Sequence, residues 1–101
     1  VPEAHLRNVT VFADHEVDRS PCGTGTCAVL AVLDAMGLTA DDAPFVHESI
    51  IGTTFSARVL SRTTVGDFPA IIPELTGAAS ITGDHTFVVA PDDVEPEGFR
   101  L

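Results

Sequence analysis

The sequence predicts an α+β fold in which an antiparallel, curved sheet wraps around one central, buried helix. Residues 28–36 are apolar on nearly every face of a helix, with Asp34 as the only charge, so other elements must enclose that helix. Strand-like segments make up much of the remaining chain, and only a sheet built from them can enclose it. The chain has 101 residues, 45% of them hydrophobic, which is enough for one core. We therefore expect residues 1–101 to form a single domain.

The first half of the chain is expected to supply one strand and the helix. Residues 6–13 are typical of a strand, and the polar residues 14–20 indicate a loop that leads to the helix. The helix is predicted over residues 27–36, with Gly37 as its C-cap. A turn over residues 38–44 then separates it from the second half.

The second half is expected to consist of strands. Residues 45–51 indicate a short strand, and residues 53–65 alternate with a period of two. A further strand, interrupted at Pro73 and Gly77, is predicted over residues 70–82. A hairpin turn at residues 82–85 leads to a last strand over residues 86–90.

The alternation in residues 53–65 predicts a half-buried strand with two different faces. The apolar face is expected to carry Phe55, Ala57, Val59 and Val65. Arg58 and Arg62 are expected to share the other face, where they either bind an anion or neutralise acidic neighbours.

Residues 18–26, Asp-Arg-Ser-Pro-Cys-Gly-Thr-Gly-Thr, place a thiol beside glycine-rich backbone near the expected helix start. A helix start presents free N–H donors and about half a positive charge, so it can hold a carboxylate and favour a thiolate over a thiol. Gly23 and Gly25 allow close approach of a ligand to the backbone. Cys22 is therefore a candidate acid/base or nucleophile. The candidate N-caps are Ser20, Thr24 and Thr26.

A simpler interpretation of the cysteines also exists. A lone Cys is most often a small buried hydrophobe, and we interpret Cys27 as such a core residue. Two features favour a role for Cys22: Asp18 precedes it by four residues, and Gly23 and Gly25 have no packing value that Ala would not supply better.

Charge and composition exclude several classes of partner. Fifteen acidic residues face five arginines and no lysine, for a net charge of −10, which argues against nucleic acid and membrane partners. The acidic surface without lysine suggests adaptation to high salt. No apolar run approaches the about 20 residues that span a bilayer. Two cysteines without a disulfide pattern, and no signal peptide, predict a cytoplasmic protein.

Cofactor and metal sites find no support in the sequence. Without lysine the chain can form neither the Schiff base of pyridoxal phosphate nor a P-loop, and its four histidines show no zinc spacing with the cysteines. Residues 23–28 fit a loose dinucleotide pattern, but no strand leads directly into them. A cysteine hydrolase would need a histidine base for Cys22, and only a coincidence of folding would bring His15, His47 or His85 to it. His85 is the best candidate of the three, although we interpret it as a hairpin residue. We expect no cofactor and no metal.

Residues 18–26 resemble the second-half cysteine motif of the proline racemase family, which includes 4-hydroxyproline 2-epimerases. The resemblance continues through FVHESIIGTTFSARV, residues 45–59, and AIIPELTGAASITGDHTFVVAPDDVEPEGF, residues 70–99. It implies one half-domain of the diaminopimelate-epimerase-like type, from a longer enzyme in which each of two similar halves supplies a catalytic cysteine. The first-half motif, Met-Cys-Gly-His, is absent from this sequence.

The resemblance implies a cofactor-independent racemase or epimerase that acts on proline or hydroxyproline. Inversion at Cα removes a proton from one face and delivers one to the other, so two groups on opposite sides of the substrate are needed. By the resemblance, Cys22 is one acid/base, and Gly23 and Thr24 bind the carboxylate. Asp18 contacts the ring nitrogen of the substrate or the hydrogen-bond network of the site. Family dehydratases carry Thr at the second cysteine position, so Cys22 favours the racemase or epimerase branch.

The absent first half leaves three explanations. The chain needs a separate N-terminal half, or it is an inactive remnant that still folds, or two copies pair as a homodimer that sets Cys22 against Cys22. A different class of function is also open, namely a noncatalytic half-domain that binds a partner chain or a small carboxylate.

Overall fold

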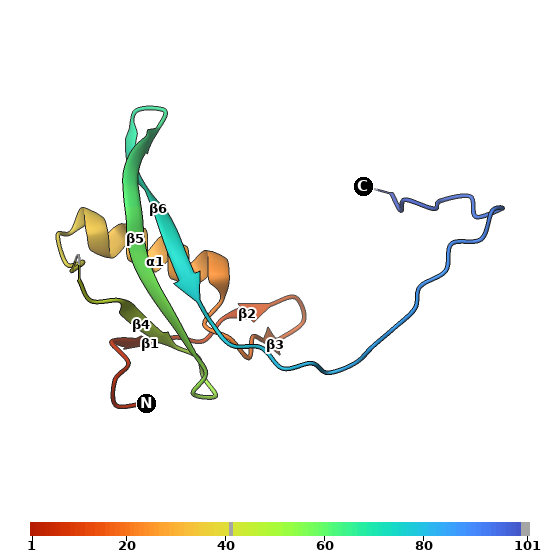
Figure 1. The fold of residues 1–101 in the computed structure, drawn as a ribbon, viewed down its shortest axis with the longest axis horizontal. Helices are drawn as coiled ribbons and strands as arrows, with labels where there is room; N and C mark the ends of the chain where they lie inside the picture. Colours follow the sequence, from red (N-terminus) through yellow and green to blue (C-terminus); the bar gives the residue numbers. More distant parts are fainter. Residues whose placement is uncertain (41, 100–101) are drawn as a thin grey trace.

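In the computed structural model the described residues, 1–40 and 42–99, form a four-stranded sheet, a two-stranded ribbon and one helix (Figure 1). The elements are β1 (Leu6–Arg7), β2 (Val11–Phe12), β3 (Glu16–Val17), α1 (Gly23–Ala35), β4 (Phe45–Glu48), β5 (Thr54–Val65) and β6 (Phe68–Thr76). The larger sheet has the order β1-β4-β5-β6, and β2 pairs with β3. The predicted α+β class is confirmed. No helix among these residues has the length and apolar character needed to cross a bilayer.

The helix α1 lies on one face of the sheet and is not enclosed by it. It packs against β5 and β6, and its fully buried residues are Thr26 and Leu30. Val32, on the same helix, is 58% exposed, and Met36 just beyond it is 65% exposed. The predicted wrapping is therefore wrong for this chain, because the described strands are enough to cover only one side of an all-round apolar helix. Cys27 is half-buried, so it is only partly the core residue that was predicted.

The larger sheet is mixed, where a wholly antiparallel sheet was predicted. β1 runs parallel to β4, whereas the β4–β5 and β5–β6 pairs are antiparallel. The predicted strand over residues 6–13 is split, because the backbone of Asn8 still bonds to Glu48 whereas Thr10 already accepts from Asp18 in the ribbon. This change of partner carries the chain from the sheet edge toward the start of α1.

The long hairpin of β5 and β6 contains a bulge that the sequence did not reveal. The predicted turn at Gly66 is present, with a positive φ of 58°. Between Val59 and Ser61 the register shifts, so residues beyond it no longer follow the alternation of the first half of β5.

The bulge separates the two arginines that were predicted to share a face. Arg58 pairs with Glu74 on the neighbouring strand at 2.7 Å, whereas Arg62 reaches Asp34 of α1 at 2.6 Å. Hydrogen bonds from Arg62 and then from Thr39 hold the pKa of Asp34 below its ordinary value. Both arginines neutralise acidic neighbours, which is one of the two roles considered for them.

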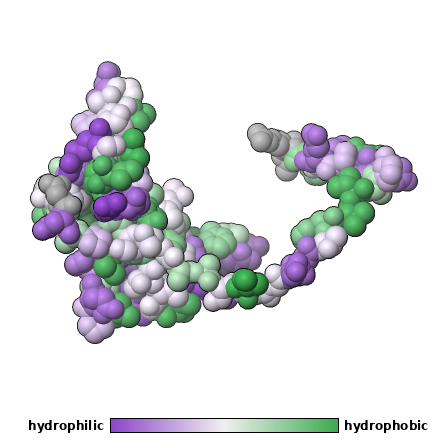
Figure 2. Space-filling view, in the orientation of Figure 1, coloured by the Kyte–Doolittle hydropathy of each residue, from purple (hydrophilic) through white to green (hydrophobic). Residues whose placement is uncertain are grey.

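Residues 77–99 contain neither helix nor strand, and they extend away from the rest of the chain (Figure 1). The predicted hairpin at residues 82–85 and strand over residues 86–90 are therefore wrong for this chain. A strand needs a partner edge for its backbone groups, and the described residues offer none there. Ile81 and Phe87 are 97% and 91% exposed, and Figure 2 shows apolar residues along this segment and on the hairpin.

Candidate functional site at the start of the helix

The thiol of Cys22 caps the helix α1. Its Sγ accepts a hydrogen bond from the backbone N–H of Gly25 at 3.4 Å, and its carbonyl accepts from the N–H of Thr26 at 2.9 Å. An N-cap side chain ordinarily accepts from the third helical residue, which is the position of Gly25. None of the hydroxyl residues predicted as N-caps takes this place, and the helix begins at Gly23 rather than at Cys27.

The backbone at Cys22 is in the left-handed region, with a φ of 67°. Such a conformation costs a residue other than glycine about 1–3 kcal/mol, so the surrounding contacts must hold it. The side chain of Asn8 donates to the carbonyl of Pro21 at 3.0 Å, and the Thr26 hydroxyl donates to the carbonyl of Cys22 at 2.6 Å. The hydroxyl of Thr53 donates to the carbonyl of Arg19. Side chains from three separate parts of the chain thus fix this loop.

Asp18 takes part in a chain of hydrogen bonds that leads to Cys22. Its Oδ1 accepts from the backbone N–H of Ser20 at 2.8 Å, and the Oγ of Ser20 accepts from the backbone N–H of Cys22 at 3.1 Å. The structure thus brings Asp18 and Cys22 into one turn. The contact that Asp18 makes here is to the loop backbone.

Gly23 and Thr24 form the first turn of α1, and both are exposed. Within the described residues, no hydrogen bond takes up the N–H of either one. A Cβ added at Gly23 would meet no atom within 4 Å, so the space in front of this turn is open. Two free donors therefore lie beside the half-buried thiol of Cys22 at the positive end of the helix. This arrangement can hold a carboxylate next to a sulfur atom.

His47, which the sequence offered only as one of three possible histidine bases for Cys22, lies beneath this turn. The residue is fully buried in β4, and its Nδ1 is 2.9 Å from the hydroxyl of Thr26. Burial lowers the pKa of His47 below its ordinary value of 6.5. Its Nε2 and the Oδ1 of Asn8 are the buried side-chain polar atoms of the described residues that lack a partner. The sequence gives no clear signal for this role, because β4 is Phe-Val-His-Glu and two of its four residues are polar.

Several alternative sites find no geometric counterpart in residues 1–40 and 42–99. No imidazole there bonds to the sulfur of Cys22, and His85 is exposed in the segment after β6, where its ring contacts Phe87. Residues 23–28 lie inside α1 and follow a two-stranded ribbon, which is not the strand-to-helix unit of a dinucleotide site. No cluster of three or more His, Cys, Asp or Glu residues that could hold a metal ion occurs in this part of the chain.

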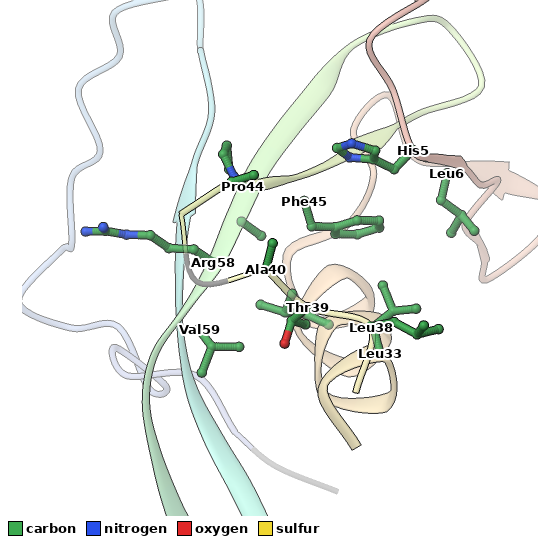
Figure 3. Close-up of a pocket in the computed structure, with 13 residues that line it drawn as sticks. His5, Leu6, Leu33, Leu38, Thr39, Ala40, Pro44, Phe45, Arg58 and Val59 are labelled. Atoms are coloured by element: carbon green, nitrogen blue, oxygen red, sulfur yellow. The ribbon is translucent and has the colours of Figure 1, made fainter. Parts of the chain in front are cut away.

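An apolar cavity of about 260 Å³ lies toward the other end of α1. Figure 3 shows Leu33, Leu38 and Phe45 around it, with the side chain of Arg58 extending away from it. Neither Cys22 nor Asp18 lines this cavity. The candidate site is therefore the open surface at the start of the helix.

Comparison with known proteins identifies the family of this fold and motif. The family model of the proline racemases matches residues 1–100. The proline racemase of Acetoanaerobium sticklandii is 55% identical over 100 residues, which are 99% of this chain and 30% of that protein. A trans-3-hydroxy-L-proline dehydratase of Bacillus cereus is 52% identical over 99 residues, 98% of this chain and 30% of that protein.

A solved structure is similar over the same region. The hydroxyproline epimerase of Agrobacterium vitis, with bound trans-4-OH-L-proline, superposes with a TM-score of 0.73 at 39% identity, covering 94% of this chain and 27% of that one. The chain thus spans about 30% of the length of the curated relatives that it matches. The match to the family model over nearly every residue decides the assignment: this chain belongs to the proline racemase family.

Proposed function

We propose that this chain is the Cys22-bearing half-domain of a cofactor-independent racemase or epimerase that acts on proline or a hydroxyproline. The observation that carries the proposal is the helix start, where the thiol of Cys22 lies beside the free N–H groups of Gly23 and Thr24. Membership of the proline racemase family supports the substrate class.

In this proposal the substrate carboxylate binds the N–H groups of Gly23 and Thr24, which brings Cα next to the sulfur of Cys22. As the Cα proton leaves, negative charge spreads onto the carboxylate. The positive end of α1 and the two donors stabilise that charge, which makes the proton easier to remove. The chain has no lysine to anchor pyridoxal phosphate as a Schiff base, so within this chain the proposal assigns the stabilisation to the backbone donors.

The proposed role of Asp18 is to hold the turn in place. Its carboxylate orders Ser20, and the hydroxyl of Ser20 in turn receives the N–H of Cys22. Loss of this chain of bonds would let the thiol move away from the donors of Gly23 and Thr24, which is costly because catalysis depends on such alignment.

Inversion also needs a second group on the opposite face of Cα. The other cysteine of the chain, Cys27, lies in the second turn of the same helix, so it cannot face Cys22 from the opposite side of a bound substrate. We propose that the second group comes from a further half-domain of the diaminopimelate-epimerase-like type, or from Cys22 of a second copy in a homodimer. Either partner would cover the exposed side of α1, where Val32 lies.

A noncatalytic half-domain that binds a small carboxylate is the second candidate. One observation favours it, namely that the described residues place a single acid/base group beside the two free donors. Such a domain would hold the same ligand at Gly23 and Thr24 without exchanging its Cα proton.

Solvent deuterium incorporation at Cα of L-proline and trans-4-hydroxy-L-proline distinguishes the two functions. The chain is incubated in D2O, and Cys22→Ser is compared with Cys27→Ser, which removes the other thiol of the same helix. Incorporation that Cys22→Ser abolishes and Cys27→Ser preserves supports the enzyme. Carboxylate binding without any incorporation supports the binding domain, and incorporation that survives Cys22→Ser contradicts the proposed mechanism.

A further inference from the structure

We infer that His47 is a positioning residue for this site, which acts through Thr26 to orient the peptide bond between Cys22 and Gly23 so that the Gly23 N–H faces the ligand. The inference rests on the proposed function only for the identity of that ligand, a carboxylate. His47 itself lies beneath the turn and contacts no substrate position.

The direction of each hydrogen bond follows from the chemistry of its partners. The Thr26 hydroxyl lies 2.6 Å from the carbonyl of Cys22 and 3.5 Å from that of Pro21, and carbonyls can only accept. We therefore assign its one hydrogen to the much closer Cys22 carbonyl. Toward His47, 2.9 Å away, the same oxygen can then only accept. The Nδ1 of His47 must therefore carry a hydrogen, and burial keeps the ring neutral at neutral pH by lowering its pKa. The remaining nitrogen, Nε2, is a bare acceptor without a partner in the described residues.

These bonds fix which way the first peptide of the helix faces. The carbonyl of Cys22 receives both the N–H and the hydroxyl of Thr26, so it points into the helix. In a trans peptide the N–H is directed opposite to the carbonyl, so the N–H of Gly23 points away from the helix. Gly23 is exposed and no hydrogen bond of the described residues takes up this N–H, so it is open to a ligand. If this peptide were to rotate, a carbonyl oxygen would replace the donor and repel a carboxylate.

The sheet supplies the rigidity that this arrangement needs. His47 is fully buried in β4, where it pairs with Leu6 on one side and Phe55 on the other. Its ring lies 5.4 Å from that of Phe45. Through Thr26, His47 thus links the position of β4 to the orientation of Cys22, whose backbone is strained.

Matched substitutions separate the proposed role from mere packing. Asparagine places an amide N–H close to where Nδ1 lies in histidine, so it can keep the bond to Thr26. It has no counterpart of Nε2, but that atom of His47 has no hydrogen-bond partner, so no bond is lost there. We expect His47→Asn to retain the function and His47→Leu to lose it. In the same way Thr26→Ser keeps the hydroxyl, and Thr26→Val removes it at nearly constant volume. The two variants without the bond should bind L-proline at least about tenfold more weakly, and the two conservative variants within about threefold of the wild type.

Two readouts need no bound ligand, so they test the inference separately from the proposed function. The ¹⁵N spectrum of the imidazole should show the Nδ1–H tautomer of His47 in the wild-type chain. The rate at which iodoacetamide alkylates Cys22, in a Cys27→Ser background, should change in Thr26→Val and return to the wild-type value in Thr26→Ser.

The outcomes are distinct. An Nε2–H tautomer at His47, or an alkylation rate that Thr26→Val leaves unchanged, overturns the inference. Should Thr26→Val fail to fold, the tautomer in the wild-type chain still decides. A wild-type chain that shows the expected tautomer and alkylation pattern but binds no L-proline supports the inference about His47 and contradicts the proposed function instead.

Discussion

Two single substitutions, Gly23→Ala and Gly25→Ala, test the geometry of the helix start. Both glycines belong to the first turn of α1, and neither has a positive φ, so alanine fits the backbone at both positions. They differ in their surroundings. A Cβ at Gly23 would meet no atom within 4 Å, whereas a Cβ at Gly25 would lie 3.5 Å from both the Cβ and the Sγ of Cys22.

The expected effect on stability is the same for both variants. Alanine is favoured over glycine in a helix by about 1 kcal/mol, and a contact at 3.5 Å is ordinary van der Waals packing that costs nothing. A gain of about 1 kcal/mol raises the Tm of a domain of this size by roughly 4–8 °C. Thermal unfolding followed by circular dichroism measures this shift. The Tm of each variant should therefore exceed that of the wild type by up to this amount.

The expected effect on the thiol differs between the variants. The new methyl group of Gly25→Ala covers one side of Sγ, so iodoacetamide should alkylate Cys22 more slowly than in the wild type. Gly23→Ala leaves Sγ uncovered and should keep the wild-type rate. Its methyl group adds bulk beside the proposed carboxylate site, so it should weaken L-proline binding. Equal slowing of alkylation in both variants, or a drop in Tm in either, would refute this geometry.

Three further predictions concern the core, the buried histidine and the surface charge. Leu30→Ala should lower the free energy of unfolding by about 2–5 kcal/mol, because Leu30 is 1% exposed. Val32→Ala should lower it by less than about 1 kcal/mol, because Val32 is 58% exposed. Equal losses for the two variants in urea unfolding would contradict the one-sided packing of α1. Burial lowers the pKa of His47, so the unfolded chain takes up this proton first, and the stabilisation present above pH 6.5 should be lost as the pH falls below that value. A stability profile that His47→Asn leaves unchanged between pH 7 and 5 would argue against this assignment. With a net charge of −10, the chain should gain Tm as KCl is raised to molar concentration, and a steady fall would exclude adaptation to high salt.

The chemistry of the helix start could be predicted because it is local in sequence. Cys22, Gly23 and Thr24 were expected at the beginning of a helix, and the structure places them there. The start itself was predicted too late, at Cys27, because proline and glycine weigh against a helix. The thiol of Cys22 accepts a hydrogen bond from the N–H of Gly25, and this cap stabilises a first turn that contains both glycines.

The parts that could not be predicted depend on partners distant in sequence. The alternation of residues 53–65 gave no sign of the bulge after Val59, and one shifted residue was enough to send Arg62 to the helix. Residues 86–90 have a strand-like pattern, but no local pattern tells whether an edge is available to pair with.

The contact between His47 and Thr26 could not be predicted for the same reason. His47 and Thr26 are 21 residues apart in sequence, and their contact exists only because β4 lies under the first turns of α1. Polar residues flank both of them, with Thr24 before Thr26 and Glu48 after His47, so neither position stands out in the sequence. A buried polar group needs a hydrogen-bond partner, but the sequence does not name that partner.

The most direct test of the helix start as a carboxylate site is a titration of the ¹⁵N-labelled chain with L-proline and, separately, with pyrrolidine, which has the ring and lacks the carboxylate. The account predicts that the amide resonances of Gly23 and Thr24 move on addition of L-proline and stay in place with pyrrolidine. Resonances that stay fixed with L-proline, or that move equally with both compounds, would contradict it.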